Sequence, residues 1–336
     1  MVGKKVLALL CSSLLVTSLI GCSGTTNEPS GGSEEKEVIE IGVTQIVEHP
    51  ALDASREGFV AALKENGYEE GKNVEYDFQN AQGDMPTTQT IAKKFVDDKV
   101  DMIYAISTPS AQAAFNATKE IPIVITAVTD PVGAGLVESL ESPGGNVTGK
   151  SGASPMDKQF QFIKDELPNI KTIGIMYNTS ESNSEVQVKR AIELSKELGI
   201  EIIQQGITSV NDIPQTLNSI LDKIDALYVQ TDNMIVSSMP IVSKICFENN
   251  KPIIGSESSH VANGAIIAIG IDYFQLGHEA GMKAVEVLEG KMPKDIPVTT
   301  QKESSIHINT DALEKLNIEF SEEIMNKATK ITGGIQ

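Results

Sequence analysis

The stretch from Met102 to Ala127 reads MIYAISTPSAQAAFNATKEIPIVITA and contains one complete strand–helix–strand pattern. The short apolar runs at 102–106 and 121–127 have the length of buried strands, whereas 110–119 is typical of a helix. Two buried strands joined by a helix indicate a parallel sheet that is covered by helices. This stretch therefore predicts an α/β fold.

The preceding segments continue the same alternation toward the N-terminus. Strands are predicted at 39–43 and 74–78, and helices at 55–66 and 87–98. Gly67 directly follows the first of these helices and is a typical helix stop. This order of elements predicts a doubly wound parallel sheet.

The second half of the chain repeats features of the first half in the same order. Residues 173–176 (IGIM) match 41–44 (IGVT), and Gly199 follows a helix as Gly67 does, both at an offset of 132 residues. Further pairs are 224–228 (IDALY) with 100–104 (VDMIY) and 251–254 (KPII) with 121–124 (IPIV). The chain of 336 residues is also long for a single core. We therefore expect two doubly wound parallel-sheet lobes joined by a hinge.

Composition and charge exclude several classes of partner. The chain has 46 acidic and 27 basic residues, with a formal net charge of −19, which argues against nucleic acid and against an anionic membrane surface. Its 40% hydrophobic content is enough to form buried cores. There is no tryptophan, so an aromatic contact to a ligand would come from residues such as Tyr104, Tyr177 or Phe274.

The N-terminal segment is predicted to be an export signal. Lys4 and Lys5 precede an apolar run at 6–20, which is short for a membrane span, and the segment ends at 19–22 (LIGC). This ending resembles a bacterial lipobox, which implies a signal peptide at 1–21, a lipid on Cys22 and a flexible tether over 22–37. The expected location is the outer face of a bacterial cell membrane, with the lipid as the only membrane contact. An ordinary signal peptide cut nearby is the alternative.

Motifs for catalysis, metals and cofactors are absent from the sequence. The glycines at 133–135 lack the third glycine of a dinucleotide fingerprint, and neither a Walker A motif nor a G-x-S-x-G elbow occurs. The four histidines show no metal-ligand spacing, and after processing only Cys246 would remain. Ser256, Glu257 and His260 lack a strained nucleophile turn. We therefore expect no enzymatic activity, no catalytic residue, no metal and no cofactor.

Candidate ligand-binding residues lie in the loops after the strands. In open parallel sheets, ligands bind beyond the carboxyl ends of the strands. These loops are rich in hydroxyls and amides, contain a few carboxylates and lack lysine and arginine. The predicted ligand-binding residues are Thr44, Gln45, His49, Ser107, Thr108, Ser110, Thr129, Asp130, Asn178, Asn183, Ser184, Asp232, Asn233, Ser256 and Glu257.

The residue types in these loops suit a zwitterion. Ser107, Thr108 and Ser110 open a predicted helix, whose N-terminus favours a carboxylate, although such residues also simply cap helices. The same two interpretations apply to 183–184, which open a helix in the second half. Asp232 follows a buried strand and would either hold an ammonium group or cap a helix. A ligand with one carboxylate and one ammonium group, such as an amino acid, fits this set.

Several longer segments carry a family resemblance. They are 41–53 (IGVTQIVEHPALD), 80–84 (NAQGD), 129–137 (TDPVGAGLV), 144–149 (GGNVTG), 177–178 (YN) and 272–277 (DYFQLG). Together they resemble the ABC transporter substrate-binding family that includes tryptophan- and aromatic-amino-acid-binding lipoproteins of the type I periplasmic-binding-protein fold. The resemblance covers about 38–317, nearly the whole mature chain.

This resemblance implies a monomeric lipoprotein that captures a small zwitterionic solute and delivers it to a permease powered by an ATPase. The expected solute is an aromatic amino acid, namely tryptophan, phenylalanine or tyrosine. In this family, loop hydroxyls, amides and an acid hold the carboxylate and the amine, and the matching positions here are Ser107, Thr108, Ser184 and Asp232. A receptor for a nucleoside or sugar, and a ligand-sensing lipoprotein without transport, are the alternatives.

The resemblance also implies the domain boundaries. Lobe 1 is expected at 38–149 plus 272–298, and lobe 2 at 150–271 plus 299–330. The hinge is expected near 148–151, near 270–272 and after Pro297, where closure would follow the hinge mechanism.

Overall fold

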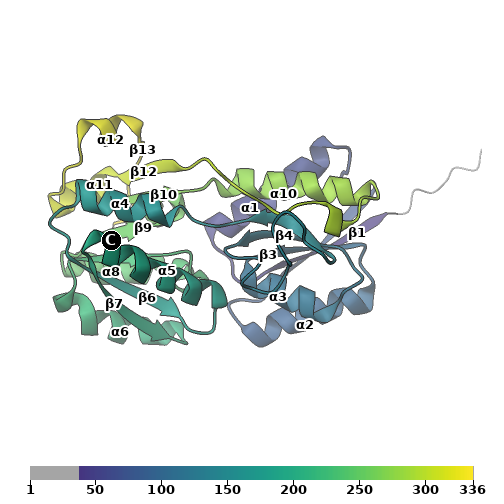
Figure 1. Ribbon diagram of the computed structural model, residues 1–336, viewed down its shortest axis with the longest axis horizontal. Coiled ribbons are helices and arrows are strands. Elements are labelled where there is room, and N and C mark those ends of the chain that lie inside the picture. Colours follow the sequence, from purple (N-terminus) through teal and green to yellow (C-terminus); the bar gives the residue numbers. More distant parts are fainter. Residues whose placement is uncertain (1–37, 336) are drawn as a thin grey trace, which may run out of the picture. The chain divides into compact units, whose positions relative to one another are not determined.

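The computed structural model describes residues 38–335, which form two β-sheets with helices packed on their faces (Figure 1). The predicted signal peptide, tether and lipidated Cys22 lie outside these residues. Ten of the eleven pairings between neighbouring strands are parallel, and only β10 and β12 run antiparallel. The predicted α/β class with two parallel-dominated sheets is confirmed.

The first sheet has six strands in the order β11-β5-β4-β3-β1-β2. The strands are β1 (Ile39–Gln45), β2 (Val74–Asn80), β3 (Met102–Ile106), β4 (Ile123–Val128), β5 (Val147–Ser151) and β11 (Thr299–Thr300). The helices that belong to it are α1 (Pro50–Glu65), α2 (Met85–Asp98), α3 (Thr108–Ala117) and α10 (Tyr273–Leu288), with the 3-10 helix η3 (Pro293–Asp295). Strand β3 is buried along its whole length, as the apolar run predicts.

The second sheet has seven strands in the order β13-β12-β10-β9-β8-β6-β7. The strands are β6 (Thr172–Asn178), β7 (Glu201–Ile207), β8 (Ala226–Val229), β9 (Ile253–Gly255), β10 (Ile267–Gly270), β12 (Ser305–Asn309) and β13 (Thr329–Ile331). The α-helices are α4 (Met156–Glu166), α5 (Ser182–Leu198), α6 (Ile213–Ile220), α7 (Asn233–Ser237), α8 (Met239–Glu248), α9 (Ser258–Ala262), α11 (Thr310–Leu316) and α12 (Glu322–Lys327). Two 3-10 helices, η1 (Val210–Asp212) and η2 (Leu221–Lys223), flank α6.

The two sheets repeat one topology. Read from one edge, the first runs β2-β1-β3-β4-β5 and the second runs β7-β6-β8-β9-β10. The matched segments at 41–44 and 173–176 are the equivalent strands β1 and β6. The internal repeat that the sequence predicts is therefore a real repeat of topology.

The chain passes between the two sheets three times. It leaves the first sheet after β5, returns between β10 and α10, and crosses again between β11 and β12. The division into lobes stays a prediction, and the strand pairings differ from it at two boundaries, 149/150 and 298/299. Thr299 and Thr300 pair with Lys150 and Ser151 of β5, so β11 belongs to the first sheet. Strand β11 has only two residues, which is too short for a recognisable pattern of apolar residues in the sequence.

The core of the first half is mostly aliphatic but contains a stacked aromatic pair. Tyr104 is 0% exposed and stacks on Phe59 with ring centroids 3.7 Å apart. Its hydroxyl lies 3.2 Å from the Ser55 hydroxyl, which in turn lies 3.1 Å from the Thr126 hydroxyl. Of the two interpretations of Tyr104, core residue or aromatic ligand contact, the structure supports the core position. Phe274, another suggested contact, is 44% exposed.

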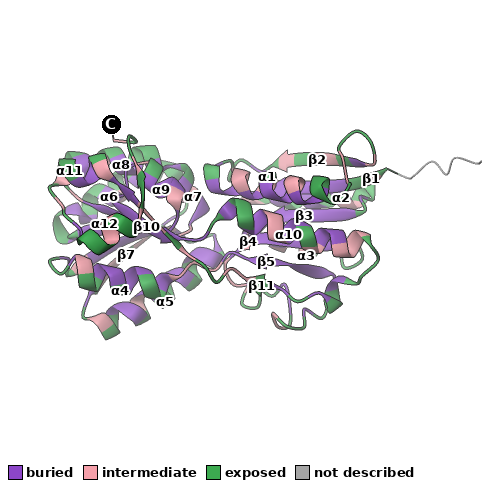
Figure 2. Ribbon diagram, turned by 90° about the horizontal axis from the view of Figure 1, so that it is seen from above, coloured by how far each residue is buried: buried purple, intermediate pink, exposed green. Residues whose placement is uncertain are grey.

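Two glycines let α1 and α10 pack closely, as Figure 2 shows for these neighbouring helices. A Cβ added at Gly277 would lie 1.8 Å from the Ser55 carbonyl oxygen, and one added at Gly58 would lie 2.0 Å from the Phe274 carbonyl oxygen. Both atoms are helix backbone and cannot turn away. The close packing attaches α10, which follows the second sheet in the chain, to the first sheet.

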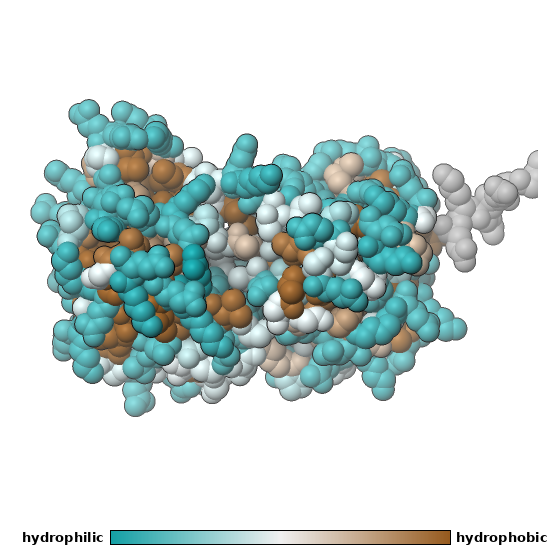
Figure 3. All heavy atoms as spheres, in the orientation of Figure 1, coloured by the Kyte–Doolittle hydropathy of each residue, from teal (hydrophilic) through white to brown (hydrophobic). Residues whose placement is uncertain are grey.

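Hydrophilic side chains cover much of the face seen in Figure 3, with apolar residues in scattered patches. Among the helices in the described part of the chain, none is both long and apolar enough to cross a membrane. Cys246 lies buried on α8, and burial raises the pKa of its thiol to about 12. This thiol is therefore protonated and shielded from solvent at neutral pH.

Candidate functional site

Loops from the two sheets enclose three adjoining cavities. We call them the wide cavity, the acid-lined cavity and the helix-end cavity, and define each by its residues below. Asn233 lines both the wide and the acid-lined cavity, and Asn183 lines both the acid-lined and the helix-end cavity. These two asparagines place the three cavities in a row.

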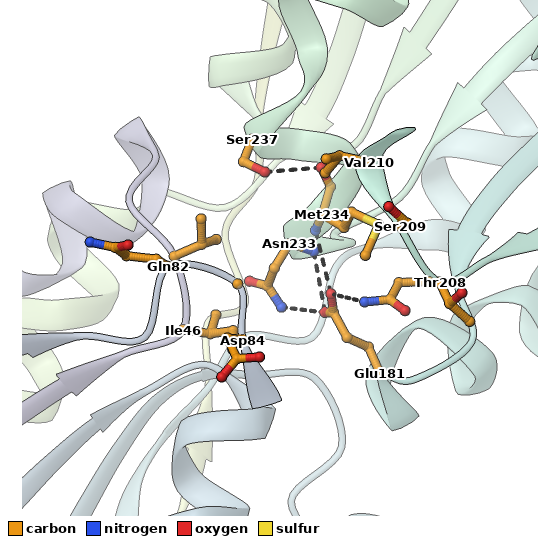
Figure 4. A pocket seen from close by; sticks show the side chains of 13 residues that line it. Ile46, Gln82, Asp84, Glu181, Thr208, Ser209, Val210, Asn233, Met234 and Ser237 are labelled. Carbon is orange, nitrogen blue, oxygen red and sulfur yellow. Dashed lines mark hydrogen bonds between the residues drawn. The ribbon is translucent and has the colours of Figure 1, made fainter. Parts of the chain in front are cut away.

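The wide cavity has a volume of about 260 Å³ and is shown in Figure 4. Its lining residues are Ile46, Val47, Gln82, Gly83, Asp84, Asn178, Glu181, Thr208, Ser209, Val210, Asn233, Met234 and Ser237. The first five follow β1 or β2 of the first sheet, and the others come from β6 and the segments after β7 and β8. Both sheets therefore contribute walls, which combine aliphatic and neutral polar groups with the carboxyl groups of Asp84 and Glu181.

The acid-lined cavity is much smaller, at about 10 Å³, which is room for one water-sized group. Its lining residues are His49, Leu52, Ala127, Asn183, Thr231, Asp232, Asn233, Val236, Glu257 and Tyr273. Two of them are carboxylic acids, and both are almost fully buried.

The helix-end cavity also measures about 10 Å³. It is lined by Thr108, Asp130, Gly133, Ala134, Ser182, Asn183 and Val186. Thr108 begins α3 and Ser182 begins α5, so the N-termini of a 10-residue and a 17-residue helix meet at this point. Helix N-termini present free N–H groups and partial positive charge, which favours an anionic group.

Three hydroxyls at the start of α3 have no hydrogen-bond partner in the described chain. Ser107, Thr108 and Ser110 are all buried, and each side-chain oxygen is unpaired. Ser107 occupies the cap position with φ 82°, but its side chain makes no capping bond. The interpretation of these residues as simple helix caps is therefore wrong. Buried and unpaired hydroxyls beside a strained backbone are typical of a binding site.

Asp232 has its carboxylate already engaged by backbone groups. One oxygen accepts from Ile235 N at 2.9 Å and caps α7, and the other accepts from Asn178 N at 2.6 Å. The capping interpretation is thus confirmed for this residue. Burial and the neighbouring negative charge of Glu181 raise the pKa of Asp232 to about 7. The residue also borders the acid-lined cavity.

Glu181 is the buried acid that the sequence reasoning missed. It is 2% exposed, and its carboxylate accepts from Asn178 Nδ2 at 3.1 Å, Asn183 Nδ2 at 3.3 Å and Met234 N at 3.3 Å. Asn233 donates to it through both its side chain and its backbone, and Figure 4 shows these bonds meeting at the carboxylate. The only feature of the sequence that marks Glu181 is its position just before a helix. Acidic residues are common at solvent-exposed helix N-termini, so this position does not indicate burial.

A second acidic group with two histidines lies beside Asp232. Glu257 accepts from the Ser259 hydroxyl at 2.5 Å, and His260 Nε2 lies 3.5 Å from the Glu257 carboxylate. Burial lowers the pKa of His260 to about 4 and also lowers the pKa of His49. Both histidines are therefore mostly neutral at pH 7. The buried acids in this region have no permanently charged cation among their contacts in residues 38–335.

The structure brings together eight of the fifteen predicted residues as cavity walls. They are His49, Thr108, Asp130, Asn178, Asn183, Asp232, Asn233 and Glu257. The other seven do not line these cavities, namely Thr44, Gln45, Ser107, Ser110, Thr129, Ser184 and Ser256. All of this second set except Thr129 are buried. The ligand-binding roles of all fifteen stay predictions.

No cluster of three or more histidine, cysteine or acidic side chains with the geometry of a metal site occurs in residues 38–335. The polar groups that this site offers to a ligand are neutral hydrogen-bond donors and buried carboxylates.

Comparison with known proteins places this arrangement among solute-binding proteins. The sequence profile of the family described as ABC transporter substrate binding protein matches residues 40–332. A tyrosine-binding protein of Clostridioides difficile is 53% identical over 324 residues, which cover 94% of this chain and 93% of that protein.

Solved structures agree with this match. A complex with L-Trp from Streptococcus pneumoniae is 36% identical with a TM-score of 0.85, covering 88% of this chain and 100% of that one. The ligand-free, open structure of a Clostridium difficile substrate-binding protein with adhesive properties is 52% identical with a TM-score of 0.68, covering 88% and 99%. The two-lobed fold expected from the sequence is confirmed by these neighbours.

Proposed function

The chain belongs to the ABC transporter substrate-binding protein family, and from this premise we propose that it binds an aromatic amino acid, tyrosine above all, for delivery to a permease powered by an ATPase. The observation that carries the proposal is the row of three cavities. They adjoin through shared wall residues, and we assign one cavity to each of the three groups that branch from the Cα of an amino acid, namely the carboxylate, the ammonium group and the side chain.

The carboxylate belongs in the helix-end cavity. The N-termini of α3 and α5 meet there, and Thr108 supplies a buried hydroxyl that has no partner in the described chain. Such a hydroxyl is costly to bury unless a ligand oxygen pairs with it. The hydroxyls of Ser107 and Ser110, close to Thr108 in the chain, are also buried without a partner in the described residues.

The ammonium group belongs in the acid-lined cavity. Asp232 and Glu257 supply negative charge, and the Asn183 side-chain oxygen is a buried acceptor with no donor in the described chain. Among residues 38–335, no lysine or arginine lines any of the three cavities. A cavity of this size with acceptors on its walls suits a single –NH3+ group.

The aromatic ring belongs in the wide cavity. Its volume lies near the lower end of the range for small-molecule sites. Ile46, Val210 and Met234 provide aliphatic and thioether surface for a ring, and methionine sulfur favours contact with aromatic rings. Gln82, Thr208 and Ser209 add neutral polar groups that suit a phenolic hydroxyl. In this proposal aliphatic and thioether groups contact the ring, and no tyrosine or phenylalanine lines this cavity among the described residues.

The relatives support this choice of ligand. The tyrosine-binding protein of Clostridioides difficile matches over nearly the full length of both chains, and the Streptococcus pneumoniae structure holds L-Trp. Both ligands are aromatic zwitterions, which supports the assignment proposed for the three cavities.

Tyrosine is expected to raise the melting temperature of the mature protein. A ligand that binds only the native state stabilises it by RT ln(1 + [L]/Kd), about 2.7 kcal/mol at 100 times Kd. Tyramine lacks the carboxylate and 3-(4-hydroxyphenyl)propionate lacks the ammonium group, so each should give a much smaller shift at equal concentration. The measurement is a thermal-shift screen that also includes nucleosides and sugars. A shift with a nucleoside or sugar and none with any amino acid would show the ligand assignment to be wrong.

We also propose that export and a lipid on Cys22 hold the protein at the outer face of a bacterial cell membrane. In cells fed an alkyne-tagged fatty acid, the wild-type chain should acquire the tag and the Cys22→Ser variant should not. Cys246→Ser is the matched control, because its thiol is buried in the folded protein. Equal labelling of wild type and Cys22→Ser would refute lipidation at this residue.

A further inference from the structure

Two buried carboxylates with no cationic partner stand side by side at the site. Asp232 is 0% exposed and Glu181 is 2% exposed. They share Asn178, whose backbone N–H bonds to Asp232 and whose side-chain amide bonds to Glu181. Two like charges held this close in a buried region cannot both remain ionised without large cost.

The donors around this pair do not supply the missing positive charge. Every hydrogen bond recorded to the two carboxylates comes from a backbone N–H, an asparagine side-chain amide or the Ser184 hydroxyl, all of them neutral. Neither acid forms an ion pair within residues 38–335. Neutral donors stabilise one negative charge well, but they leave the second charge uncompensated.

We propose that Asp232, buried near the negative charge of Glu181, holds a proton in the ligand-free protein and that the ammonium group of the bound amino acid displaces this proton into solvent. The inference rests on the proposed function, because it requires a cationic ligand group at the acid-lined cavity. Ligand binding is then coupled to the loss of a proton, so a lower pH favours release of the amino acid.

Unpaired acceptors at the same place point independently to a cationic donor. The Asn183 side-chain oxygen is buried, with the residue 5% exposed, and has no donor in the described chain. The Gln230 side-chain oxygen is fully buried and likewise unpaired, while its amide nitrogen donates to the Ser184 carbonyl oxygen at 3.1 Å. Asn183 borders the acid-lined cavity together with Asp232. A group with several N–H donors and a positive charge suits the two of these groups that line the acid-lined cavity, the Asn183 oxygen and the Asp232 carboxylate.

Other titratable groups face the pair from the surrounding elements. They are His49 before α1, Asp53 on α1, Glu257 and His260 at α9, and Tyr273 at the start of α10. Burial lowers the pKa of both histidines and raises the pKa of Tyr273, so these three groups are mostly neutral at pH 7. Glu257 adds a further negative charge, which strengthens the demand for a proton or a ligand cation.

The direction of the pH dependence follows from these charges. The pKa of Asp232 is raised to about 7 in the ligand-free protein, and a bound ammonium group lowers it by favouring the carboxylate. Above this pKa the pair is already ionised, so binding releases no proton and affinity is greatest. Below it each ligand must displace a proton, so Kd rises by up to about tenfold per pH unit as the pH falls.

The test is calorimetric titration of the mature protein with L-tyrosine in buffers of different ionisation enthalpy. Over about pH 5.5–7.5 the carboxyl of tyrosine stays ionised and its amine stays protonated, so the ligand itself contributes no proton. Wild type should release about one proton per ligand at the acid end of this range and clearly less at the upper end. Glu181→Gln and Asp232→Asn should each abolish the release and flatten the dependence of Kd on pH.

Control variants distinguish this proposal from a proton held by another residue and from failure of the proposed function. Glu185→Gln removes an exposed acid from the same helix and should leave the proton release unchanged. If His49→Gln abolishes the release while Glu181→Gln does not, the proton belongs to the histidine and the proposal is overturned. Tyrosine binding by wild type with no proton exchange at any pH overturns the proposal and leaves the proposed function intact. Absence of binding by any aromatic amino acid overturns both.

Discussion

Gly277→Ala is expected to lower the free energy of unfolding by about 3 kcal/mol or more, although alanine is the better helix former. Helix propensity alone would favour alanine by about 1 kcal/mol. The added Cβ, however, would lie 1.8 Å from the Ser55 carbonyl oxygen, so α1 and α10 would have to separate. The steric overlap outweighs helix propensity here, because the atoms that the new Cβ would meet belong to the backbone of Ser55 and cannot rotate away.

Urea denaturation followed by circular dichroism measures this effect. Gly145→Ala is the matched control, because a Cβ at Gly145 meets no atom within 4 Å. We expect the midpoint to fall sharply for Gly277→Ala and to change little for Gly145→Ala. Equal midpoints for the two variants would contradict the close packing of α1 on α10.

The double variant Thr108→Val/Ser110→Ala should bind tyrosine about 10- to 100-fold more weakly, yet resist unfolding better than wild type. A hydrogen bond to a charged group contributes about 1.5–3 kcal/mol, so loss of the Thr108 hydroxyl, which lines the helix-end cavity, has a large effect on Kd. In the ligand-free protein these hydroxyls are buried without partners, so their removal relieves a desolvation cost. Calorimetric titration gives the first quantity, and urea denaturation without ligand gives the second.

Thr126→Val is the matched control for this pair of effects. Thr126 is also fully buried, but its hydroxyl is bonded to Ser55 at 3.1 Å and lies in β4. This variant should lose stability and keep its affinity for tyrosine, which is the opposite pattern. If the double variant keeps wild-type affinity, the start of α3 does not hold the ligand carboxylate.

The sequence predicted the elements of the first half well, but it placed three helix starts too late. The predictions at 55, 87 and 110 compare with observed starts at Pro50, Met85 and Thr108. All three helices carry a proline in the first turn. Proline is favoured there because its missing N–H has no intrahelical partner to lose, whereas the sequence reasoning had treated it as part of a loop.

The candidate site was only partly predictable for a different reason. The strand ends and their hydroxyl-rich loops are local features, so Thr108, Asn183 and Asp232 could be found from sequence alone. The burial of Glu181 depends on donors from 178, 183 and 233–234, which the chain order does not bring together. The unpaired state of the α3 hydroxyls is likewise a property of the folded packing, since the same residues cap helices elsewhere.

The burial of the Cys246 thiol makes this protein well suited to site-specific fluorescent labelling at introduced cysteines. Past residue 22 the sequence contains no other cysteine, and Cys246 lies in the core with a pKa of about 12. Maleimide dyes react with exposed thiolates, so this side chain stays unlabelled while the protein is folded. A cysteine introduced at an exposed position of each half would therefore accept a fluorophore selectively. Energy transfer between the two dyes would then follow hinge motion and ligand capture in single molecules.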